Sequence, residues 1–228
     1  MDRHNLLALV ASFGLLLGTL VAAEIGHRLW RTSRFFGRKL VAIGIGMGSL
    51  ATLRIFTSWK WGLVPPLTMA ALYYASYRYE LFQAVEDDER VNLGLVFFPL
   101  SVALLLGWLW RPGSSEDAGY IAVAGLMATT WGDTAAALVG KRFGTRRYRF
   151  FGHPRTMEGT LTLFLAASTA MAPVLALAGG MDWHQSVAFA LIAGTVAACV
   201  EIVSLYGSDN LTVPGAAALT LYALSSLS

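Results

Sequence analysis

Long apolar runs separated by short polar connections dominate the chain. A hydrocarbon core of about 30 Å needs roughly 20 apolar residues in a helix, so each run is a candidate membrane span. Read with a window of about 19 residues, the sequence predicts about eight transmembrane helices. They cover about residues 5–26, 40–57, 62–79, 93–110, 119–140, 160–179, 184–206 and 211–227. The expected fold class is all-α, a polytopic membrane helical bundle that forms one domain over residues 1–228.

Glycine and proline positions add local detail to these predicted helices. Pro65-Pro66 predicts the start or a kink of the third span, because proline fits the first turn of a helix better than its interior. Gly44 and Gly48 are four residues apart, a spacing typical of closely packed membrane helices. Val213-Pro214 favours an extended entry into the last span, since the residue before proline is biased away from the helical conformation.

The composition supports a membrane protein. The chain is 56% hydrophobic and 14% charged, whereas a typical soluble domain is about 25% charged. The net charge of +3 is small, and no nucleic-acid partner is expected. A cleaved signal peptide is the alternative reading of the first run, but the run exceeds the usual apolar region of a signal peptide and a basic cluster follows it. We therefore expect a retained first span.

The basic residues predict the orientation in the membrane. They concentrate after the first and fifth predicted spans, and the positive-inside rule places both connections in the cytoplasm. The N-terminus is then outside, as is the C-terminus after eight spans. Two acidic connections, Glu86–Glu89 and Gly207–Asn210, fall on the same cytoplasmic side. The basic residues of the two connections are Arg28, Arg31, Arg34, Arg38 and Lys39, and Lys141, Arg142, Arg146, Arg147, Arg149 and Arg155.

Asp133 is the main candidate for chemistry, because it lies inside an apolar run. A charged residue at the centre of a span costs about 2.5–3.5 kcal/mol on insertion scales, and such residues usually face a protein interior or a cavity. A basic, glycine-containing connection follows, and Glu158 closes it. Carboxylates beside basic groups are typical of a site for a phosphorylated ligand with a divalent ion. The alternative is an Asp paired with a basic residue to join two helices.

Other acidic residues near the predicted cytoplasmic face are weaker candidates. Glu158 opens the sixth span, where a carboxylate also stabilises a helix N-terminus. Glu201 and Asp209 lie near the connection between the last two spans. They are either further metal or hydroxyl contacts or ordinary polar residues at helix ends.

Several segments together resemble the polyprenol kinase family, which groups phytol, farnesol and dolichol kinases with CTP-dependent diacylglycerol kinases. The family is distantly related to phosphatidate cytidylyltransferases. The block from Asp133 to Glu158 is the most specific part, and the motif order covers most of the chain from Arg38 to Pro214. The segments are Arg38-Lys39, Trp131–Ala136 through Gly140, Lys141–Gly144, Thr156–Thr160 and Asp209–Pro214.

The resemblance implies a CTP- and Mg²⁺-dependent transfer of phosphate to a lipid alcohol of the phytol, geranylgeraniol or polyprenol type. Mg²⁺ is expected at Asp133 with Glu158 or Asp209, and Asp209 is a candidate to accept the proton of the alcohol. The catalytic residues are then Asp133, Asp209 and Lys141. The expected nucleotide-binding residues are Arg38, Lys39, Gly140, Lys141, Arg142, Arg146, Arg147 and Asn210.

Two other classes of enzyme and one non-enzymatic class stay open at this point. A CTP-dependent diacylglycerol kinase or a phosphatidate cytidylyltransferase would use the same nucleotide and metal. A transporter or lipid-binding protein would instead carry its carboxylates along a path through the membrane, whereas here they gather toward one face. The expected location is the plasma (inner) membrane, with membrane lipids around the bundle and the active site facing the cytoplasm.

Overall fold

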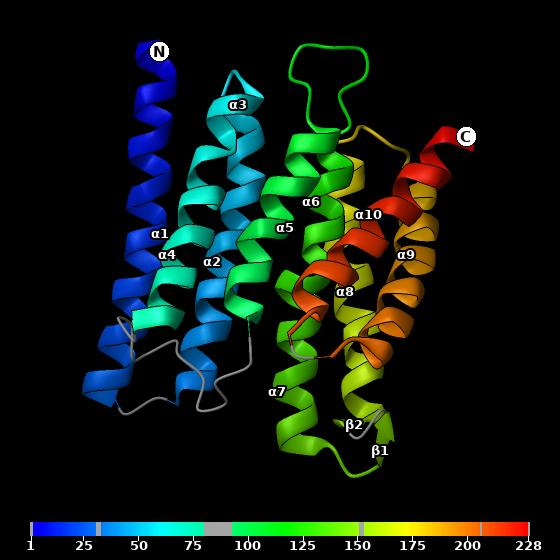
Figure 1. The fold of residues 1–228 in the computed structure, drawn as a ribbon. Helices are drawn as coiled ribbons and strands as arrows, with labels where there is room; N and C mark the ends of the chain where they lie inside the picture. The colour runs from blue at the N-terminus through cyan, green and yellow to red at the C-terminus, as the bar shows by residue number, and fades with distance from the viewer. Residues whose placement is uncertain (1, 31–32, 80–92, 151–152, 206, 228) are drawn as a thin grey trace.

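The computed structural model describes residues 2–30, 33–79, 93–150, 153–205 and 207–227. These residues form a bundle of helices with one small β-hairpin at its end (Figure 1). The first half contains α1 (Arg3–Trp30), α2 (Arg34–Ile55), α3 (Trp59–Gly62), α4 (Val64–Tyr79) and α5 (Gly94–Leu109). The second half contains α6 (Gly119–Met127), η1 (Ala128–Asp133), α7 (Thr134–Phe143), β1 (Arg147–Phe150), β2 (His153–Thr156), α8 (Met157–Leu177), α9 (Trp183–Val203) and α10 (Asp209–Leu227).

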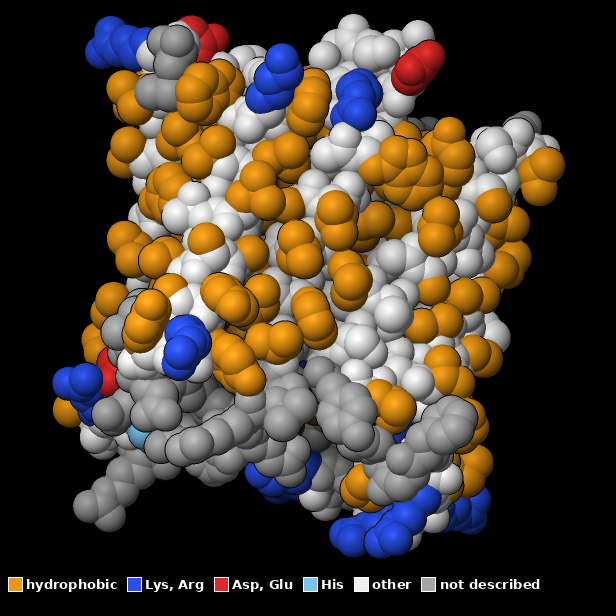
Figure 2. Space-filling view, viewed as in Figure 1, with side chains coloured by type: hydrophobic (Ala, Val, Ile, Leu, Met, Phe, Trp, Pro, Cys, Tyr) orange, Lys and Arg blue, Asp and Glu red, His pale blue; other side chains and the backbone are white. Residues whose placement is uncertain are grey.

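Each predicted span overlaps a helix of the bundle, which confirms the all-α fold. Among the residues that the structure describes, four helices are long and apolar enough to cross a membrane: α1 over Arg3–Leu29, the continuous α6–η1–α7 helix, α8 and α9. Apolar side chains cover the middle of the visible face, and Lys and Arg lie at its ends (Figure 2). Both termini lie at one end of the bundle and the hairpin at the other (Figure 1). The number of eight spans and their orientation in the membrane stay predictions.

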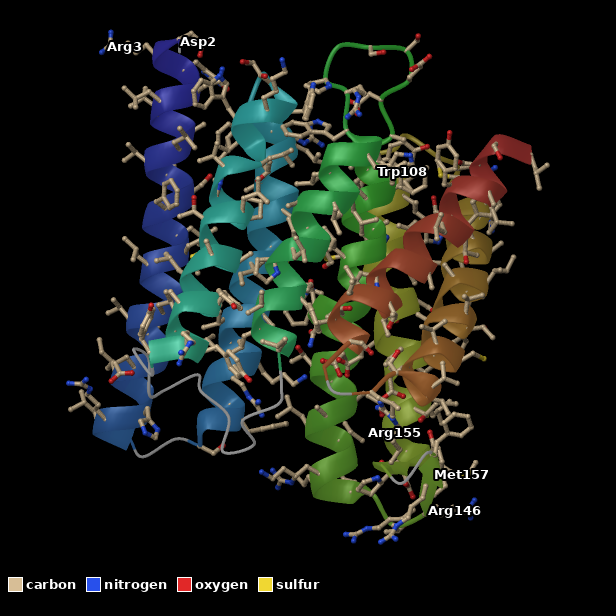
Figure 3. The ribbon with its side chains drawn as sticks, in the orientation of Figure 1. Asp2, Arg3, Trp108, Arg146, Arg155 and Met157 are labelled. Atoms are coloured by element: carbon tan, nitrogen blue, oxygen red, sulfur yellow. The ribbon has the colours of Figure 1, made fainter. Side chains whose placement is uncertain are left out.

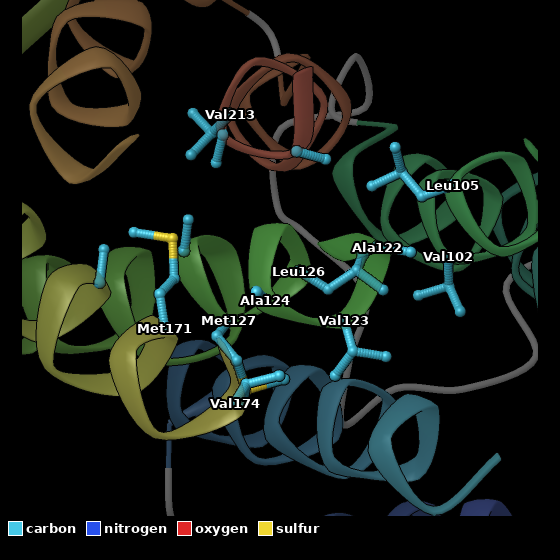
Figure 4. Close-up of a cluster of buried hydrophobic side chains, with 14 of the residues drawn as sticks. Val102, Leu105, Ala122, Val123, Ala124, Leu126, Met127, Met171, Val174 and Val213 are labelled. Carbon is cyan, nitrogen blue, oxygen red and sulfur yellow. The ribbon is translucent and has the colours of Figure 1, made fainter. Parts of the chain in front are cut away.

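The α6 helix is the centre of the core. Its residues are buried on all sides, as is typical of a helix that is apolar around its whole circumference. Leu126 and Val123 are fully buried, and Val102 of α5, Met171 of α8 and Val213 of α10 surround them (Figure 4). Small residues allow this close packing: a Cβ on Gly125 would lie only 2.8 Å from the carbonyl oxygen of Pro214 on α10. The helix that carries Asp133 is therefore the most enclosed helix of the bundle.

The predicted glycine and proline effects are partly confirmed. Pro65 and Pro66 lie in the first turn of α4, where their missing N–H groups cost no helical hydrogen bond. A Cβ on Gly44 would meet Thr19 of α1 at 2.4 Å, so this glycine is needed for the close contact of α1 and α2. The expected extended entry at Val213-Pro214 is wrong. The α10 helix begins at Asp209 and includes Pro214, and its tertiary packing overrides the local preference.

The basic connection after the fifth span is more ordered than the sequence analysis predicts. The α7 helix continues to Phe143, and β1 then pairs antiparallel with β2, with Tyr148 opposite Arg155. Alternate residues of β1 differ in exposure, as expected for a strand: Arg147 and Arg149 are exposed, and Tyr148 and Phe150 are half-buried. The Tyr148 hydroxyl lies 2.7 Å from Thr160 Oγ1, which holds the hairpin against α8. The acidic run Glu86–Glu89 lies outside the described residues.

We expect the two ends of the bundle to lie on opposite sides of the membrane. In a Cys199→Ser background, Ser114→Cys samples the end with the termini and Thr145→Cys samples the end with the hairpin. A membrane-impermeant maleimide added to intact cells should label Cys at position 114 and should label position 145 only after permeabilisation. Labelling of both positions from the same side would contradict the predicted orientation.

Candidate active site

A cavity of about 180 Å³ collects polar side chains from three segments that are distant in the sequence. Arg38 and Lys39 come from α2, Asp133 from the end of η1, and Asp209 and Asn210 from the start of α10. The rest of the lining is glycine or apolar: Phe35, Val41, Ala42, Ile45, Gly94, Leu95, Phe98 and Gly207. The lining of the cavity therefore combines charged and apolar side chains.

Lys39 and Asp133 form an ion pair across the cavity. The Nζ atom of Lys39 lies 2.5 Å from Oδ2 of Asp133, and each side chain is 18% exposed. The same Nζ lies 5.9 Å from the centre of the Phe35 ring, which adds a cation–π contact. The pair of Asp133 with a basic residue, the alternative raised from the sequence, is thus present and joins α2 to η1. Both side chains also line the cavity that contains Arg38 and Asp209.

A π-helical turn positions Asp133. Residues Ala128–Asp133 of η1 form this turn between α6 and α7, and π-turns inside α-helices are frequent at functional sites. Two glycines allow other residues to pack closely around this turn. A Cβ on Gly46 would lie 1.9 Å from Thr130 Oγ1, and one on Gly132 would lie 2.9 Å from the Cβ of Ala167. Trp131 is 40% exposed while Asp133 lines the cavity, so the turn separates an outward aromatic from an inward carboxylate.

Asp209 and Asn210 enter the cavity from the turn before α10. Gly207 has a φ of 80°, a conformation that glycine adopts without strain, and it reverses the chain between α9 and α10. The backbone N–H of Asn210 donates to Oδ1 of Asp209 over 2.9 Å. Asp209 precedes the apolar stretch 211–227. Burial raises the pKa of its carboxyl group, and the negative charge of Asp133 raises it further, while Lys39 and Arg155 lower it.

Lys141 lies beside the cavity. It is in the last turn of α7, and its Nζ is 4.7 Å from the centre of the Phe35 ring. Phe35 lines the cavity, and its ring contacts both Lys39 and Lys141. The guanidinium carbon of Arg142 instead lies 5.4 Å from the centre of the Phe143 ring. Arg142, Arg146 and Arg147 are exposed and do not line the cavity, and Figure 3 shows Arg146 beyond Arg155, toward the end of the molecule.

Gly140 was expected at the nucleotide and Glu158 at the metal, but both make contacts that hold neighbouring segments together. A Cβ on Gly140 would lie 2.9 Å from Thr156 Oγ1, the hydroxyl that caps α8, so this glycine permits the close approach of α7 and α8. Glu158 accepts hydrogen bonds from the Thr145 hydroxyl over 2.6 Å and from the Arg146 N–H over 3.1 Å. Neither residue lines the cavity. The structure therefore brings Asp133 and Asp209 together, but it does not bring Glu158 to them.

A second ion pair, which was not anticipated, lies next to Asp209. Arg155 of β2 pairs with Oε1 of Glu201 on α9, and its Nη2 donates to the carbonyl oxygen of Ser204 over 2.9 Å. Arg155 thus points from the hairpin toward the α9–α10 turn (Figure 3). The Ser204 hydroxyl lies 2.7 Å from Thr212 Oγ1, which ties the end of α9 to the start of α10. Arg155 therefore joins the hairpin to the turn that carries Asp209.

The donors in the cavity fit a divalent ion that is shared with a phosphate ligand. Within the described part of the chain, no cluster of three or more His, Cys, Asp or Glu side chains could hold a metal ion. Mg²⁺ usually binds through one or two carboxylates, phosphate oxygens and water rather than an all-protein cage. Asp133 and Asp209 provide such a pair, with the cations needed for phosphate beside them.

A helical membrane bundle with this cavity defines a class of integral membrane protein whose site suits a phosphate-bearing, metal-bound ligand. The chain is 35% identical to the phytol kinase of Synechocystis sp. over 215 residues, which cover 92% of this chain and 89% of that protein. The dolichol kinases of Mus musculus and Homo sapiens are each 28% identical over 141 residues, which cover 59% of this chain and 26% and 25% of those proteins. No protein-family model matches the sequence. No solved structure matches it either.

The chain belongs to the polyprenol kinase family, as its similarity to the phytol kinase over nearly its whole length shows. It is therefore an integral membrane phosphotransferase that uses an alcohol group as the acceptor.

We expect the loss of one partner of the Arg155–Glu201 ion pair to lower the free energy of unfolding more than the loss of both partners. Their side chains are 19% and 8% exposed, so Arg155→Met leaves a buried carboxylate without its partner and should cost about 3–5 kcal/mol. The double variant Arg155→Met/Glu201→Met should recover most of this loss. Thermal unfolding in detergent measures both effects, and equal destabilisation in the single and double variants would contradict the prediction.

Proposed function

We propose that this protein transfers the terminal phosphate of CTP to the hydroxyl of an isoprenoid alcohol, with Mg²⁺ as the cofactor. One observation carries the proposal: Arg38, Lys39, Asp133, Asp209 and Asn210, from three distant segments, line one cavity together with apolar side chains of α2 and α5. Such a cavity fits the two chemically different reactants of a lipid kinase. The phytol and dolichol kinases among its relatives support an isoprenoid alcohol as the acceptor.

Asp133 and Asp209 are the residues that would hold Mg²⁺ in this cavity. When bound, the ion neutralises charge on the phosphate oxygens and orients the phosphate for transfer. Lys39 already contacts Asp133, so it is within reach of a phosphate bound beside that carboxylate. Glu158 remains a proposed further ligand only if the 145–146 segment releases it.

The basic residues act at two distances from the cavity. Arg38 and Lys39 line it and Lys141 lies next to it, so these three stabilise the negative charge of the triphosphate during transfer. The start of α10 adds the positive end of a helix dipole next to Asn210. Arg142, Arg146 and Arg147 are exposed near the hairpin and raise the local concentration of the anionic nucleotide. Gly140 serves this site indirectly, through the packing of α7 on α8.

The chemical step forms one bond and breaks one bond. The oxygen of the alcohol attacks the terminal phosphorus, and the bond from that phosphorus to the bridging oxygen breaks to release CDP. The Asp209 carboxylate accepts the proton of the alcohol. The phosphorylated lipid and the proton are the other products.

The family resemblance supports CTP rather than another nucleoside triphosphate, since no base-reading contact follows from the described side chains. The basic end of the bundle supports a cytoplasmic site, where soluble nucleotide is available. We place the protein in the plasma (inner) membrane on this basis. The direct test is transfer of label from CTP, radiolabelled in the terminal phosphate, to phytol and geranylgeraniol by the purified protein. Release of pyrophosphate instead would indicate a cytidylyltransferase.

Asp133→Asn should reduce phosphate transfer at least ~100-fold, because the amide keeps the shape of the side chain but loses the charge that binds Mg²⁺. Glu116→Gln is the control, since Glu116 is exposed at the opposite end of the bundle. Both variants should elute as folded protein in size-exclusion chromatography. Turnover by Asp133→Asn within a few fold of the parent would rule out the metal role of this carboxylate.

Removal of divalent ions with EDTA should abolish transfer, and added Mg²⁺ should restore it, because only two carboxylates hold the ion in the proposed site. Isothermal titration should show that CTP binds more weakly in EDTA than in Mg²⁺. Full activity after exhaustive chelation would contradict the proposed cofactor.

A further inference from the structure

A second cavity, of about 240 Å³, lies between α1, α2, α4 and α5 and plays no part in the phosphate chemistry. Its lining is almost entirely hydrocarbon. It consists of Ala11, Ser12, Leu15 and Leu16 of α1; Ile45, Gly48, Ser49, Ala51, Thr52 and Ile55 of α2; Pro65, Pro66 and Met69 of α4; and Val102 of α5.

This second cavity adjoins the active-site cavity. Ile45 lines both, and its side chain is only 5% exposed. The α5 helix also lines both, with Phe98 in the first cavity and Val102, one turn further along, in the second. Two different helices therefore extend from the charged site into the apolar cavity.

Two of the three hydroxyl residues that line the second cavity, Ser49 and Thr52, present little polarity to an occupant. The Ser49 hydroxyl donates to the carbonyl oxygen of Gly46 over 2.6 Å, and the Thr52 hydroxyl donates to that of Gly48 over 2.9 Å. Both donors are used within α2. The cavity thus suits a hydrocarbon chain and offers little to a nucleotide or a lipid headgroup.

We propose that this second cavity binds the hydrocarbon tail of the lipid alcohol and thereby selects its chain length. The inference rests on the proposed function, because a tail needs its hydroxyl in the adjoining charged cavity. The Cα atoms of Ile45 and Ile55 are about 15 Å apart along α2 at 1.5 Å per residue, so the part of α2 that lines the cavity matches a tail of about this length. Ile45, at the junction, is the residue that the first part of the tail must pass.

Gly48 is the position at which this idea is best tested. A Cβ there would meet only Leu15 Cδ2, at 3.5 Å, which is an ordinary contact. A larger side chain at Gly48 therefore enters the cavity without a backbone clash. Gly14 of α1 provides a matched control, because a Cβ there has no atom within 4 Å and Gly14 does not line the cavity.

The experiment compares the parent, Gly48→Leu and Gly14→Leu with farnesol, geranylgeraniol and a long polyprenol. Gly48→Leu should lower kcat/KM for the longer alcohols roughly tenfold or more relative to farnesol, as expected when a pocket loses space for part of a chain. Gly14→Leu should keep the selectivity of the parent. An unchanged ratio in Gly48→Leu, or an equal loss for all three alcohols, would overturn the tail-binding role.

A readout that is independent of turnover separates this inference from the proposed function. A photoreactive geranylgeraniol should crosslink to α2 between residues 45 and 55 and to α4 near residues 65–69. Excess geranylgeraniol should prevent the crosslinks and excess phosphatidylethanolamine should not. Crosslinks elsewhere, or displacement by the phospholipid, would show that the cavity holds general membrane lipid. Specific crosslinks without transfer of phosphate from CTP would retain the cavity and reject the proposed CTP-dependent reaction.

Discussion

The ion pair between Lys39 and Asp133 determines how the bundle is arranged around its site. A carboxylate inside an apolar helix must find a cation or a polar cavity, because an isolated charge there is costly. The partner comes from α2, 94 positions earlier in the chain. Once Lys39 faces Asp133, the rotation of α2 is fixed, and residues at helical spacing from Lys39 must face the same way. Ala42, three residues further along, does so and lines the same cavity.

The same electrostatic requirement acts a second time at the start of α10. Asp209 is close enough to Asp133 for the two like charges to raise its pKa, so both carboxylates need nearby cations. Lys39 provides one and Arg155 the other. Arg155 also binds Glu201 and the Ser204 carbonyl. Through Arg155, the hairpin thus supports the turn that places Asp209.

The helical bundle and the polar residues of the cavity could be predicted from the sequence. Long apolar runs, and a charged residue such as Asp133 inside one, are local features of the sequence. The sequence was not sufficient for three features. The π-turn at Ala128–Asp133 depends on packing against Gly46 and Ala167. The β1–β2 hairpin was not predicted, because its segment was interpreted only as a basic connection between spans. The alternation of Arg147, Tyr148 and Arg149 nevertheless indicates a strand. The positions of Glu158 and Gly140 depend on contacts with Thr145 and Thr156, which only a structure reveals.

One face of α2 explains how polar and apolar chemistry coexist in this protein. From Arg38 the face continues through Ala42, Ile45, Ser49 and Thr52, at alternating spacings of four and three residues that keep them on one side of a helix. The cation lies at one end, and the hydroxyls of Ser49 and Thr52 are bonded to their own backbone. A molecule with one polar end and a long hydrocarbon chain has the same arrangement of polar and apolar groups along its length. The polarity of α2 therefore matches that of an amphiphilic alcohol aligned along it.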